Sequence, residues 1–341
     1  MFTLIQLKKT ALALSLCTAL IPTTSFAKVI KVDPGNSNAY ATLASATEVL
    51  RAGDTLWIEP GTGPYREVLR VPVSGTEGDP IIIEGNGNEI TGFEPLKFKN
   101  GNASVKADSS FVLRFEGKRI KQHTNGEFEY GVEYDPSNGL ISLSRGISDE
   151  GWEISSRDAV VVLGTVFNHI YRNLVVTGSL NDGINLHGKS SGLVFDNVEV
   201  YQNFDEGISA HDTVELTIRN SRFYENDNGL LNIGKSYVRL ENVDFYDNLG
   251  LGLAFSGEAG FYAENVRTWG NGITQLLIRK EVDASCDVLE VYQNGNKEKP
   301  WMTYSESANM NKVSNSVLSH RFVWRSGEPT YYNQTTPNDV H

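Results

Sequence analysis

Five segments of the chain repeat one pattern at a nearly constant interval. Four of the segments run from an asparagine through alternating apolar residues to an aromatic residue and a second asparagine, and the fainter fifth, 288–294, begins with valine. The aromatic positions are Tyr201, Tyr224, Tyr246, Trp269 and Tyr292, so the interval between neighbouring segments varies by no more than one position. Short alternating runs punctuated by glycine or asparagine predict two or three short strands per repeat. A unit of this size cannot bury its apolar face alone, so the repeats must stack on one another.

The stacked repeats predict an all-β chain wound into a parallel solenoid. The asparagines that open four of the segments, together with Asn173 of a similar segment one turn earlier, form one column: Asn173, Asn197, Asn220, Asn242 and Asn265. We expect this column to be an amide ladder at one corner of the solenoid, and the aromatic column to form a stack. Both columns are interpreted as structural features.

The repeats resemble the right-handed parallel β-helix of pectate lyases, chondroitinase-type lyases, polygalacturonases and mannuronan C5-epimerases. Residues 40–50 resemble the amphipathic helix that caps the first coil of such proteins, and residues 52–85 resemble the opening of many secreted β-helix enzymes. The resemblance implies a single-stranded right-handed parallel β-helix of the pectin-lyase type with an N-terminal cap helix. It also implies a polysaccharide substrate.

The pattern is interrupted once and then lost. Residues 130–143 alternate around a Pro-Ser-Asn-Gly turn, which predicts a β-hairpin excursion from the solenoid. The chain therefore divides into a signal peptide (1–27), an N-terminal cap with the first coils (28–92), a β-hairpin insertion (93–157), the parallel β-helix repeats (158–296) and a C-terminal tail or cap (297–341).

The first residues are typical of a secretory signal peptide. Lys8 and Lys9 precede the apolar run 11–21, and Ser25 and Ala27 are the small residues that a signal peptidase requires. The run is too short to span a membrane, and no small residue precedes Cys17, so no membrane or lipid anchor is expected. We expect cleavage after Ala27 and a secreted or periplasmic protein.

The net charge of the chain restricts the kinds of molecule that it can bind. The net charge of −12 argues against nucleic acid, because phosphate binding needs a basic surface. An anionic polysaccharide would need a local group of positive charges, for which Lys235, Arg279 and Lys189 are candidates. Cleavage would leave one cysteine, Cys286, and so no disulfide within the chain. We expect a monomer.

Two coils align without a gap. Asn181 to Gly188 matches Asp205 to Asp212 position by position, so the two histidines of these segments should occupy the same place in adjacent coils. Because side chains alternate along a strand, four polar residues should share one outward face: Asn185, His187, Ser209 and His211. Counting from the corner asparagines adds Lys235 and Arg279 to this face, with an uncertainty in register of one or two positions.

Such a face suits chemistry on a polyuronate. Removing the C5 proton beside a carboxylate needs a cation, a base and an acid. His211 fits the base, since the pKa of an unperturbed histidine lies near neutrality, and Lys235 or Arg279 fits the cation. Asp212 would orient the imidazole of His211 only if the chain turns there. Surface histidines without a catalytic role are the alternative interpretation.

Residues 207–212 resemble the Gly-Phe-Asp-Pro-His-Asp/Glu motif of mannuronan C5-epimerases. The glycine, the apolar residue, the histidine and the acid match, whereas Ser209, Ala210 and Glu206 replace the aspartate, proline and preceding tyrosine of the motif. The resemblance implies that His211 transfers protons. The loss of the tyrosine removes one proton donor, so a lyase that uses another acid is a further possibility.

A second resemblance points to hydrolysis. Asn181-Asp182-Gly183, followed one coil later by Asp205-Glu206, resembles the paired acid motifs of polygalacturonases, which are inverting hydrolases. The Gly-His-Gly expected next is absent. Turn formation before glycine is the structural alternative for these acids, and a calcium site at Asp182, Asp205 and Glu206 is a third interpretation.

The sequence therefore predicts an exported uronate polysaccharide lyase or C5-epimerase-like enzyme, with calcium as a candidate cofactor. An inverting glycoside hydrolase and a non-catalytic carbohydrate-binding protein are the alternatives. The predicted residues are His211, Lys235, Arg279 and Glu206 for catalysis, His187, Asn185, Asp212 and Ser209 for substrate binding, and Asp182 and Asp205 for a metal ion.

Overall fold

The computed structural model describes residues 27–122, 127–279, 282–293, 322–324 and 330–340. The predicted signal peptide lies outside the described residues except for Ala27. Within the described part of the chain, no helix has the length and apolar character needed to cross a membrane.

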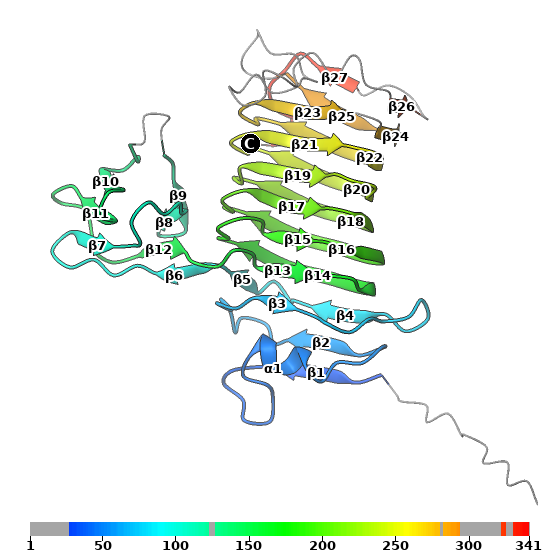
Figure 1. Cartoon of the computed structure of the whole chain (residues 1–341), viewed down its shortest axis with the longest axis horizontal. Coiled ribbons are helices and arrows are strands. Elements are labelled where there is room, and N and C mark those ends of the chain that lie inside the picture. Colours follow the sequence, from blue (N-terminus) through cyan, green and yellow to red (C-terminus); the bar gives the residue numbers. More distant parts are fainter. Residues whose placement is uncertain (1–26, 123–126, 280–281, 294–321, 325–329, 341) are drawn as a thin grey trace, which may run out of the picture.

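The chain forms a solenoid whose coils stack from the N-terminal helix to the C-terminal strands (Figure 1). One long parallel sheet has 13 described strands. Its strands are β1 (Val29–Val32), β2 (Thr55–Ile58), β4 (Ile81–Glu84), β5 (Glu89–Thr91), β14 (Phe167–Thr177), β16 (Lys189–Tyr201), β18 (Thr213–Tyr224), β20 (Tyr237–Tyr246), β22 (Gly260–Trp269), β24 (Val282–Cys286), β25 (Leu289–Tyr292), β26 (Phe322–Trp324) and β27 (Thr330–Tyr332). The predicted parallel β-helix is confirmed.

A second parallel sheet of seven described strands forms another face of the same coils. Its strands are β3 (Leu69–Arg70), β13 (Val161–Leu163), β15 (Ile184–Leu186), β17 (Glu206–Ala210), β19 (Asn228–Asn232), β21 (Leu251–Ser256) and β23 (Thr274–Arg279). The interior between the sheets is filled by apolar side chains, in which equivalent aromatic residues stack from coil to coil. Phe223 and Phe245, for example, lie 5.0 Å apart between ring centroids.

The two predicted columns form at the corners. The Asn197 amide donates to Asn173 at 2.7 Å, and Asn265 donates to Asn242 at 2.8 Å, but the Asn220 amide donates to Asp196 instead of Asn197. The aromatic column stacks with ring centroids 4.6–4.9 Å apart from Tyr201 to Trp269. Tyr292 meets Trp269 edge-on at 6.4 Å.

A second, buried asparagine ladder runs through the next corner. Asn226 accepts the backbone N–H of Asn203 at 3.1 Å, and Asn248 accepts that of Asn226 at the same distance. Asn271 does the same for Asn248 at 3.1 Å. These amides replace water as partners of backbone groups that the corner buries, so they hold successive coils in register.

The cap helix α1 (Leu43–Thr47) covers the first coil, but it is shorter than the predicted helix over 40–50. Thr42 caps it by accepting from the Ser45 N–H at 3.2 Å, and Glu67 accepts from two further N–H groups of the first turn. The Thr47 hydroxyl donates back to the Ala44 carbonyl, which competes with continuation of the helix.

Residues 93–157, here called the excursion, leave the solenoid beside β5 and form two antiparallel sheets rather than one hairpin (Figure 1). One sheet contains β7 (Asn102–Ser104), β10 (Val132–Asp135) and β11 (Leu140–Leu143), the other β6 (Phe93–Pro95), β8 (Leu113–Phe115), β9 (Lys118–Ile120) and β12 (Trp152–Ser155). The hairpin at the Pro-Ser-Asn-Gly turn exists as β10–β11. The additional strands form because the excursion buries its own apolar cluster around Trp152.

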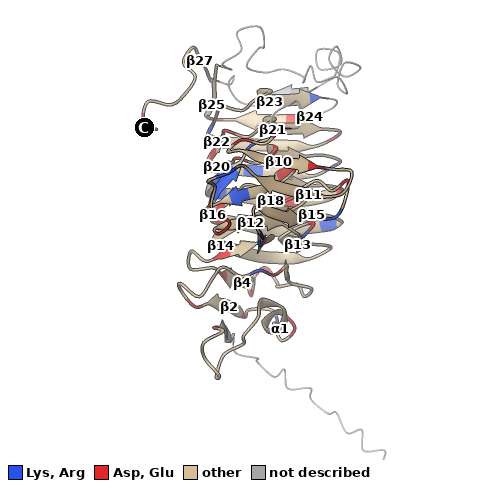
Figure 2. Cartoon of the chain, turned by 90° about the vertical axis from the view of Figure 1, so that its left-hand side faces the viewer, with Lys and Arg blue, Asp and Glu red and all other residues tan. Residues whose placement is uncertain are grey.

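The excursion packs beside the seven-stranded sheet. Viewed from its side, β10, β11 and β12 lie in front of the central coils (Figure 2). Arg119 of β9 reaches the solenoid and donates to the backbone carbonyls of Asn203, at 3.1 Å, and Glu225. The Gln202 amide donates in return to the Gly117 carbonyl at 3.2 Å. These contacts place one wall of a cleft against the coils that hold the candidate residues.

Candidate functional site

Strands β15 and β17 position most of the candidate side chains. They pair in parallel with Asn185 opposite Ser209 and Leu186 opposite Ala210, as the alignment of the two coils predicts. Leu186 and Ala210 are buried in the interior. The acidic candidates lie where the strands begin, and the histidines follow where they end.

Three carboxylates gather at the start of these strands. Asp182, Asp205 and Glu206 each bring one oxygen within 4.8 Å of the others. Gly183 and Gly207 follow in the two coils because a Cβ there would lie 2.6 Å and 2.8 Å from the amide nitrogens of the buried asparagine ladder. The same glycines that allow close stacking of the coils thus bring the acidic side chains together.

Burial and mutual repulsion hold protons on this cluster. Burial, followed by hydrogen bonding to Asp182 and the charge of Asp205, raises the pKa of Glu206 to about 10. Burial likewise raises the pKa of Asp205. Asp182 accepts from the Asn185 amide at 2.5 Å through Oδ2, whereas its buried Oδ1 has no hydrogen-bond partner. A buried carboxylate oxygen without a partner, facing two other carboxyls, is the arrangement that a cation stabilises.

Two charged residues lie at the border of the cluster, and neither was predicted from the sequence. Asp227 lies one coil beyond Asp205, and burial followed by the charge of Asp205 raises its pKa. Arg119 of the excursion is deeply buried, which lowers its pKa to about 10 against the opposing effects of Asp227 and Glu225. The spacing of Asp205 and Asp227 was visible in the sequence, but no repeat relates Arg119 to the solenoid.

The two histidines form a stacked pair at the other end of the strands. The ring centroids of His187 and His211 lie 4.3 Å apart with 9° between the ring planes. His211 Nε2 shares a hydrogen bond of 2.5 Å with the hydroxyl of Ser209. Burial, then the charge of His187, lowers the pKa of His211, so its imidazole is neutral at pH 7. A neutral imidazole is the form that accepts a proton.

Asp212 turns toward the other histidine. Its φ of +58° places it in the left-handed region, and its carboxylate accepts from the Gly188 N–H at 2.8 Å. The same Oδ2 lies 3.5 Å from His187 Nδ1. The chain does turn at Asp212, as the sequence argument required, but the carboxylate lies against His187 and not against His211.

The pairing of β17 with β19 places Lys235 outside the column of the two histidines. Leu186 lies opposite Ala210, but Ala210 lies opposite Asn232, so the second of these coils is shorter than the first by two positions. The position next to His211 is therefore Ile233. Lys235 lies further along the chain, where its Nζ is 3.3 Å from Glu258. Lys235 does lie in the next coil, where its N–H donates to the Asp212 carbonyl at 2.7 Å, but the expectation that it shares the column of His211 is corrected.

The other two basic candidates are Arg279 and Lys189. Arg279 occupies the column of His211 three coils on, after Ile233 and Ser256, and its Nε donates to the Ser256 hydroxyl at 3.0 Å. Lys189 is exposed at the first position of β16, shortly after His187.

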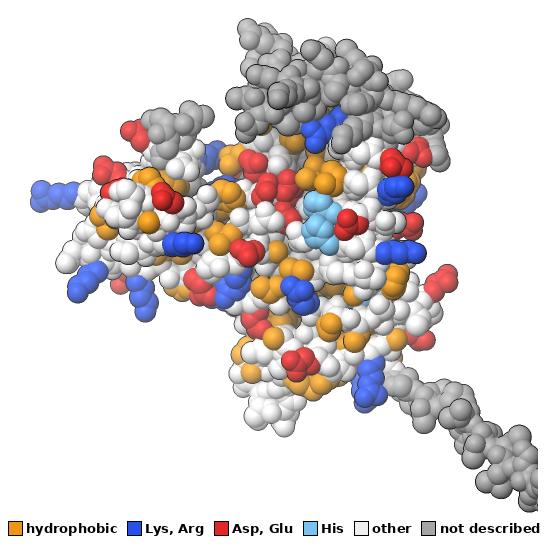
Figure 3. Space-filling model, viewed as in Figure 1, with side chains coloured by type: hydrophobic (Ala, Val, Ile, Leu, Met, Phe, Trp, Pro, Cys, Tyr) orange, Lys and Arg blue, Asp and Glu red, His pale blue; other side chains and the backbone are white. Residues whose placement is uncertain are grey.

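A cleft runs beside the acidic cluster where the excursion faces the solenoid. It has a volume of about 360 Å³, and Asp205, Asp227 and Arg119 lie in its wall. In the space-filling view, acidic side chains gather between the excursion and the paired histidines (Figure 3). Asp182 and Glu206 are buried, so the cluster reaches this face through the partly exposed Asp205.

A fold of this kind is described by a known family model. Residues 159–318 match the model of the right-handed β-helix region. The match covers the coils that contain the acidic cluster and the histidine pair. The described architecture and this match define the protein as a right-handed parallel β-helix protein.

Solved structures with the same fold include enzymes that process carbohydrates. An alginate lyase from Paenibacillus sp. strain FPU-7 is 16% identical, with a TM-score of 0.52 and 82% of each chain covered. A glycoside hydrolase is 10% identical, with a TM-score of 0.51, 92% of this chain covered and 97% of the other. Pectate lyase Pel9A is 14% identical, covering 92% of this chain and 79% of its own, at a TM-score of 0.47. No curated protein sequence matches significantly.

Proposed function

We propose that the protein is an exported enzyme that removes the C5 proton of a uronate residue in a polysaccharide, as a lyase or a C5-epimerase. The observation that carries this proposal is the carboxylate cluster with the unpartnered Asp182 Oδ1, on the same pair of strands as a neutral, half-buried His211. Proton removal next to a carboxylate requires a cation and a base, and the same pair of strands carries a candidate for each. The fold shared with an alginate lyase is consistent with this chemistry.

The cluster fits calcium. Asp182, Asp205 and Glu206 offer hard oxygen ligands that lie within 4.8 Å of one another, and calcium prefers such ligands. When bound there, the ion would neutralise the substrate carboxylate and so acidify the C5 proton. In this assignment Glu206 gives up the proton that its raised pKa retains and acts as a ligand, rather than as the acid that the sequence suggested.

His211 is the proposed base. Because Nε2 is hydrogen-bonded to the Ser209 hydroxyl, the other ring nitrogen, Nδ1, takes the C5 proton. The electrons of the C–H bond form the C4–C5 double bond, and the C4–O4 bond breaks in a lyase reaction. The imidazolium then returns the proton to the leaving oxygen. In an epimerase reaction no bond to O4 breaks. A water molecule on the opposite side of the ring would protonate C5, and the imidazolium would release its proton to the resulting hydroxide. The Ser209 hydroxyl holds the imidazole in place at 2.5 Å.

Other polar residues on this face are proposed to bind substrate. Asn185 lies between the cluster and the histidines, and Asp212 fixes His187 beside the base. The net charge of −12 repels a polyanion at long range, so local positive charges must offset it. Arg279 and Lys189 are the candidates for this role, and Lys235 extends the basic edge of the face.

The geometry disfavours the inverting hydrolase. An inverting hydrolase separates its two carboxyl groups by roughly 6.5–9.5 Å to leave room for a water molecule. One oxygen from each of the three clustered carboxylates lies within 4.8 Å of the others, which is shorter than that separation. A non-catalytic binding protein would use the same face without turnover, and the following experiment distinguishes it.

The test is incubation with a panel of polyuronates, with calcium or with a chelator, while the ultraviolet absorbance of unsaturated products is recorded. Epimerisation is followed in parallel by NMR. We expect turnover of one polymer with calcium and its loss on chelation or in Asp205→Asn. Asp247→Asn is the control, since the pKa of Asp247 is also raised by burial but this residue lies outside the cluster. Binding without turnover would contradict the proposal. So would turnover that neither chelation nor Asp205→Asn reduces.

A further inference from the structure

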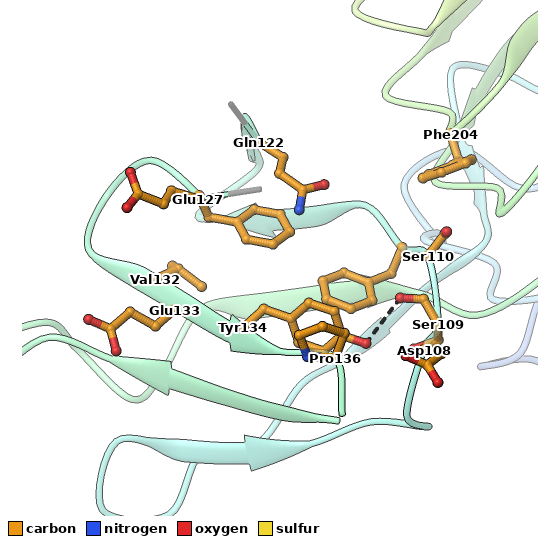
Figure 4. A pocket seen from close by; sticks show the side chains of 12 residues that line it. Asp108, Ser109, Ser110, Gln122, Glu127, Val132, Glu133, Tyr134, Pro136 and Phe204 are labelled. Atoms are coloured by element: carbon orange, nitrogen blue, oxygen red, sulfur yellow. Dashed lines mark hydrogen bonds between the residues drawn. The ribbon is translucent and has the colours of Figure 1, made fainter. Parts of the chain in front are cut away.

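A larger pocket lies at the outer end of the cleft, between the excursion and the solenoid (Figure 4). Its volume is about 640 Å³. The lining residues include Asp108, Phe111, Glu127, Glu133, Tyr134 and Phe204. All except Phe204 come from the excursion, so the pocket exists because residue 204 of the solenoid faces this inserted segment.

Aromatic rings form the floor and the opposite wall of the pocket. Phe111 stacks with Phe128 at 5.7 Å and meets Tyr134 edge-on at 4.9 Å. The Tyr134 hydroxyl donates to the Ser109 carbonyl at 3.2 Å, which fixes the ring. Phe204, on the solenoid side, remains 37% exposed. Flat apolar surface with hydroxyl and carboxylate groups at its rim suits a sugar ring, which has C–H faces and hydroxyl edges.

The charge of the pocket selects against a uronate. Asp108, Glu127 and Glu133 are in its lining, and no lysine or arginine is among its described lining residues. A carboxylate in this pocket would lie near like charges without a neutralising partner. An uncharged sugar residue has no such cost, and its hydroxyls can donate to the acidic side chains.

The pocket is continuous with the proposed catalytic face. Phe111, Gln122, Phe128 and Phe204 also line the smaller cleft, whose far end is formed by Asp205 and Asp227. Phe204 directly precedes Asp205 in the chain. A polymer held with one residue at the carboxylate cluster would therefore pass its next residues along Phe204 and into the pocket.

We propose that this pocket is a subsite for an uncharged sugar residue of the substrate, and that the substrate is a mixed polysaccharide with uncharged residues next to the uronate. The position of the uronate in this inference rests on the proposed function. The excursion then sets substrate specificity, because it supplies the aromatic floor and the acidic rim.

The test compares polymers that share a uronate. Polygalacturonate is set against a polymer of alternating galacturonate and rhamnose, and polyglucuronate against a polymer that contains both glucuronate and glucose. We expect higher kcat/KM for a mixed polymer. Phe204→Ala should raise KM for that polymer by about three- to tenfold, with kcat nearly unchanged. Tyr237→Ala is the matched control, with a similar exposure of 40% outside the pocket, and should leave KM unchanged.

A charge change tests the same subsite in the other direction. Glu133→Lys should improve KM for the homopolymer, because it adds a positive charge to the rim of the pocket. If the homopolymer is preferred and neither variant changes KM, the subsite is refuted while the proposed function stands. If no polymer is turned over, but calorimetry shows mixed-polymer binding that Phe204→Ala weakens, the subsite stands and the proposed function falls. If neither turnover nor such binding is observed, both the subsite and the proposed function are overturned.

Discussion

The imidazole rings of His187 and His211 stack in parallel, 4.3 Å apart between centroids. The parallel register of β15 and β17, in which Leu186 lies opposite Ala210, places the two histidines that follow one immediately above the other. Two imidazolium ions at this distance repel each other, so protonating one disfavours protonation of the other. Asp212 lies on the His187 side of the pair, 3.5 Å from Nδ1. Burial and the neighbouring His187 lower the pKa of His211, which favours the neutral imidazole that accepts a proton.

His211→Ala should remove most of the activity. A general base contributes roughly 10²–10⁴-fold to the rate, and His211 is the base in the proposed reaction. The thermal midpoint should change little, since the side chain is only half-buried. His187→Ala is the control and should reduce activity less, through substrate binding. Full activity in His211→Ala would exclude this residue as the base, and an unfolded variant would show that the histidine is structural.

The pH profile should report the stacked pair. Burial and His187 lower the pKa of His211, so the acidic limb of kcat/KM should have its midpoint below the usual histidine value of 6.5. His187→Asn removes the repelling charge and should move this midpoint to higher pH. Initial rates at low substrate concentration across the pH range measure it. An unchanged midpoint in His187→Asn would mean that the limb belongs to another group.

Stability without calcium should fall as the pH rises. The pKa of Glu206 is raised from 4.5 to about 10 in the folded protein, so the native state holds a proton that the unfolded chain loses. Its contribution to stability is complete below pH 4.5 and is lost progressively as the pH rises toward 10. Glu206→Gln should flatten this dependence, as measured by urea unfolding at several pH values with a chelator present. Calcium should stabilise the wild type at pH 8 and have less effect on the variant. A pH dependence that is the same in both proteins would contradict the account.

The buried asparagine ladder should contribute measurably to folding. Asn226→Leu leaves the buried Asn203 N–H without its partner, which costs about 1–3 kcal/mol of unfolding free energy. Asn220→Gly is the control, because it removes an exposed amide from the outer ladder and keeps a residue suited to the φ of +53°. Denaturant unfolding should show the smaller loss for the control. Equal losses would indicate that burial of the inner ladder adds nothing.

The parts of the site that repeat could be predicted, and the parts that do not repeat could not. Equivalent residues in stacked coils occupy equivalent places, so the sequence alone aligned Asp182 with Glu206 and His187 with His211. Counting failed at Lys235 because the coil that reaches Asn232 is shorter by two positions than the coil before it. The contact between Asp212 and His187 depends on a left-handed backbone conformation at Asp212. The sequence alone did not show that the chain turns there.

Arg119 shows the second limit of sequence reasoning. It comes from the excursion, whose strands pair among themselves and share no period with the coils. Its place beside Asp227 and Glu225 depends on how the inserted segment docks, which is decided by packing over many residues. The same holds for the pocket at Phe204, since only one of its walls belongs to the solenoid.

The central claim is that the protein removes the C5 proton of a uronate, and reaction in deuterium oxide tests it most directly. A polyuronate that the protein accepts is incubated in D₂O with calcium, and the product is examined by NMR. The account predicts either unsaturated ends or deuterium at C5, and the loss of both signals in His211→Ala. New reducing ends with neither signal would show hydrolysis and contradict the account.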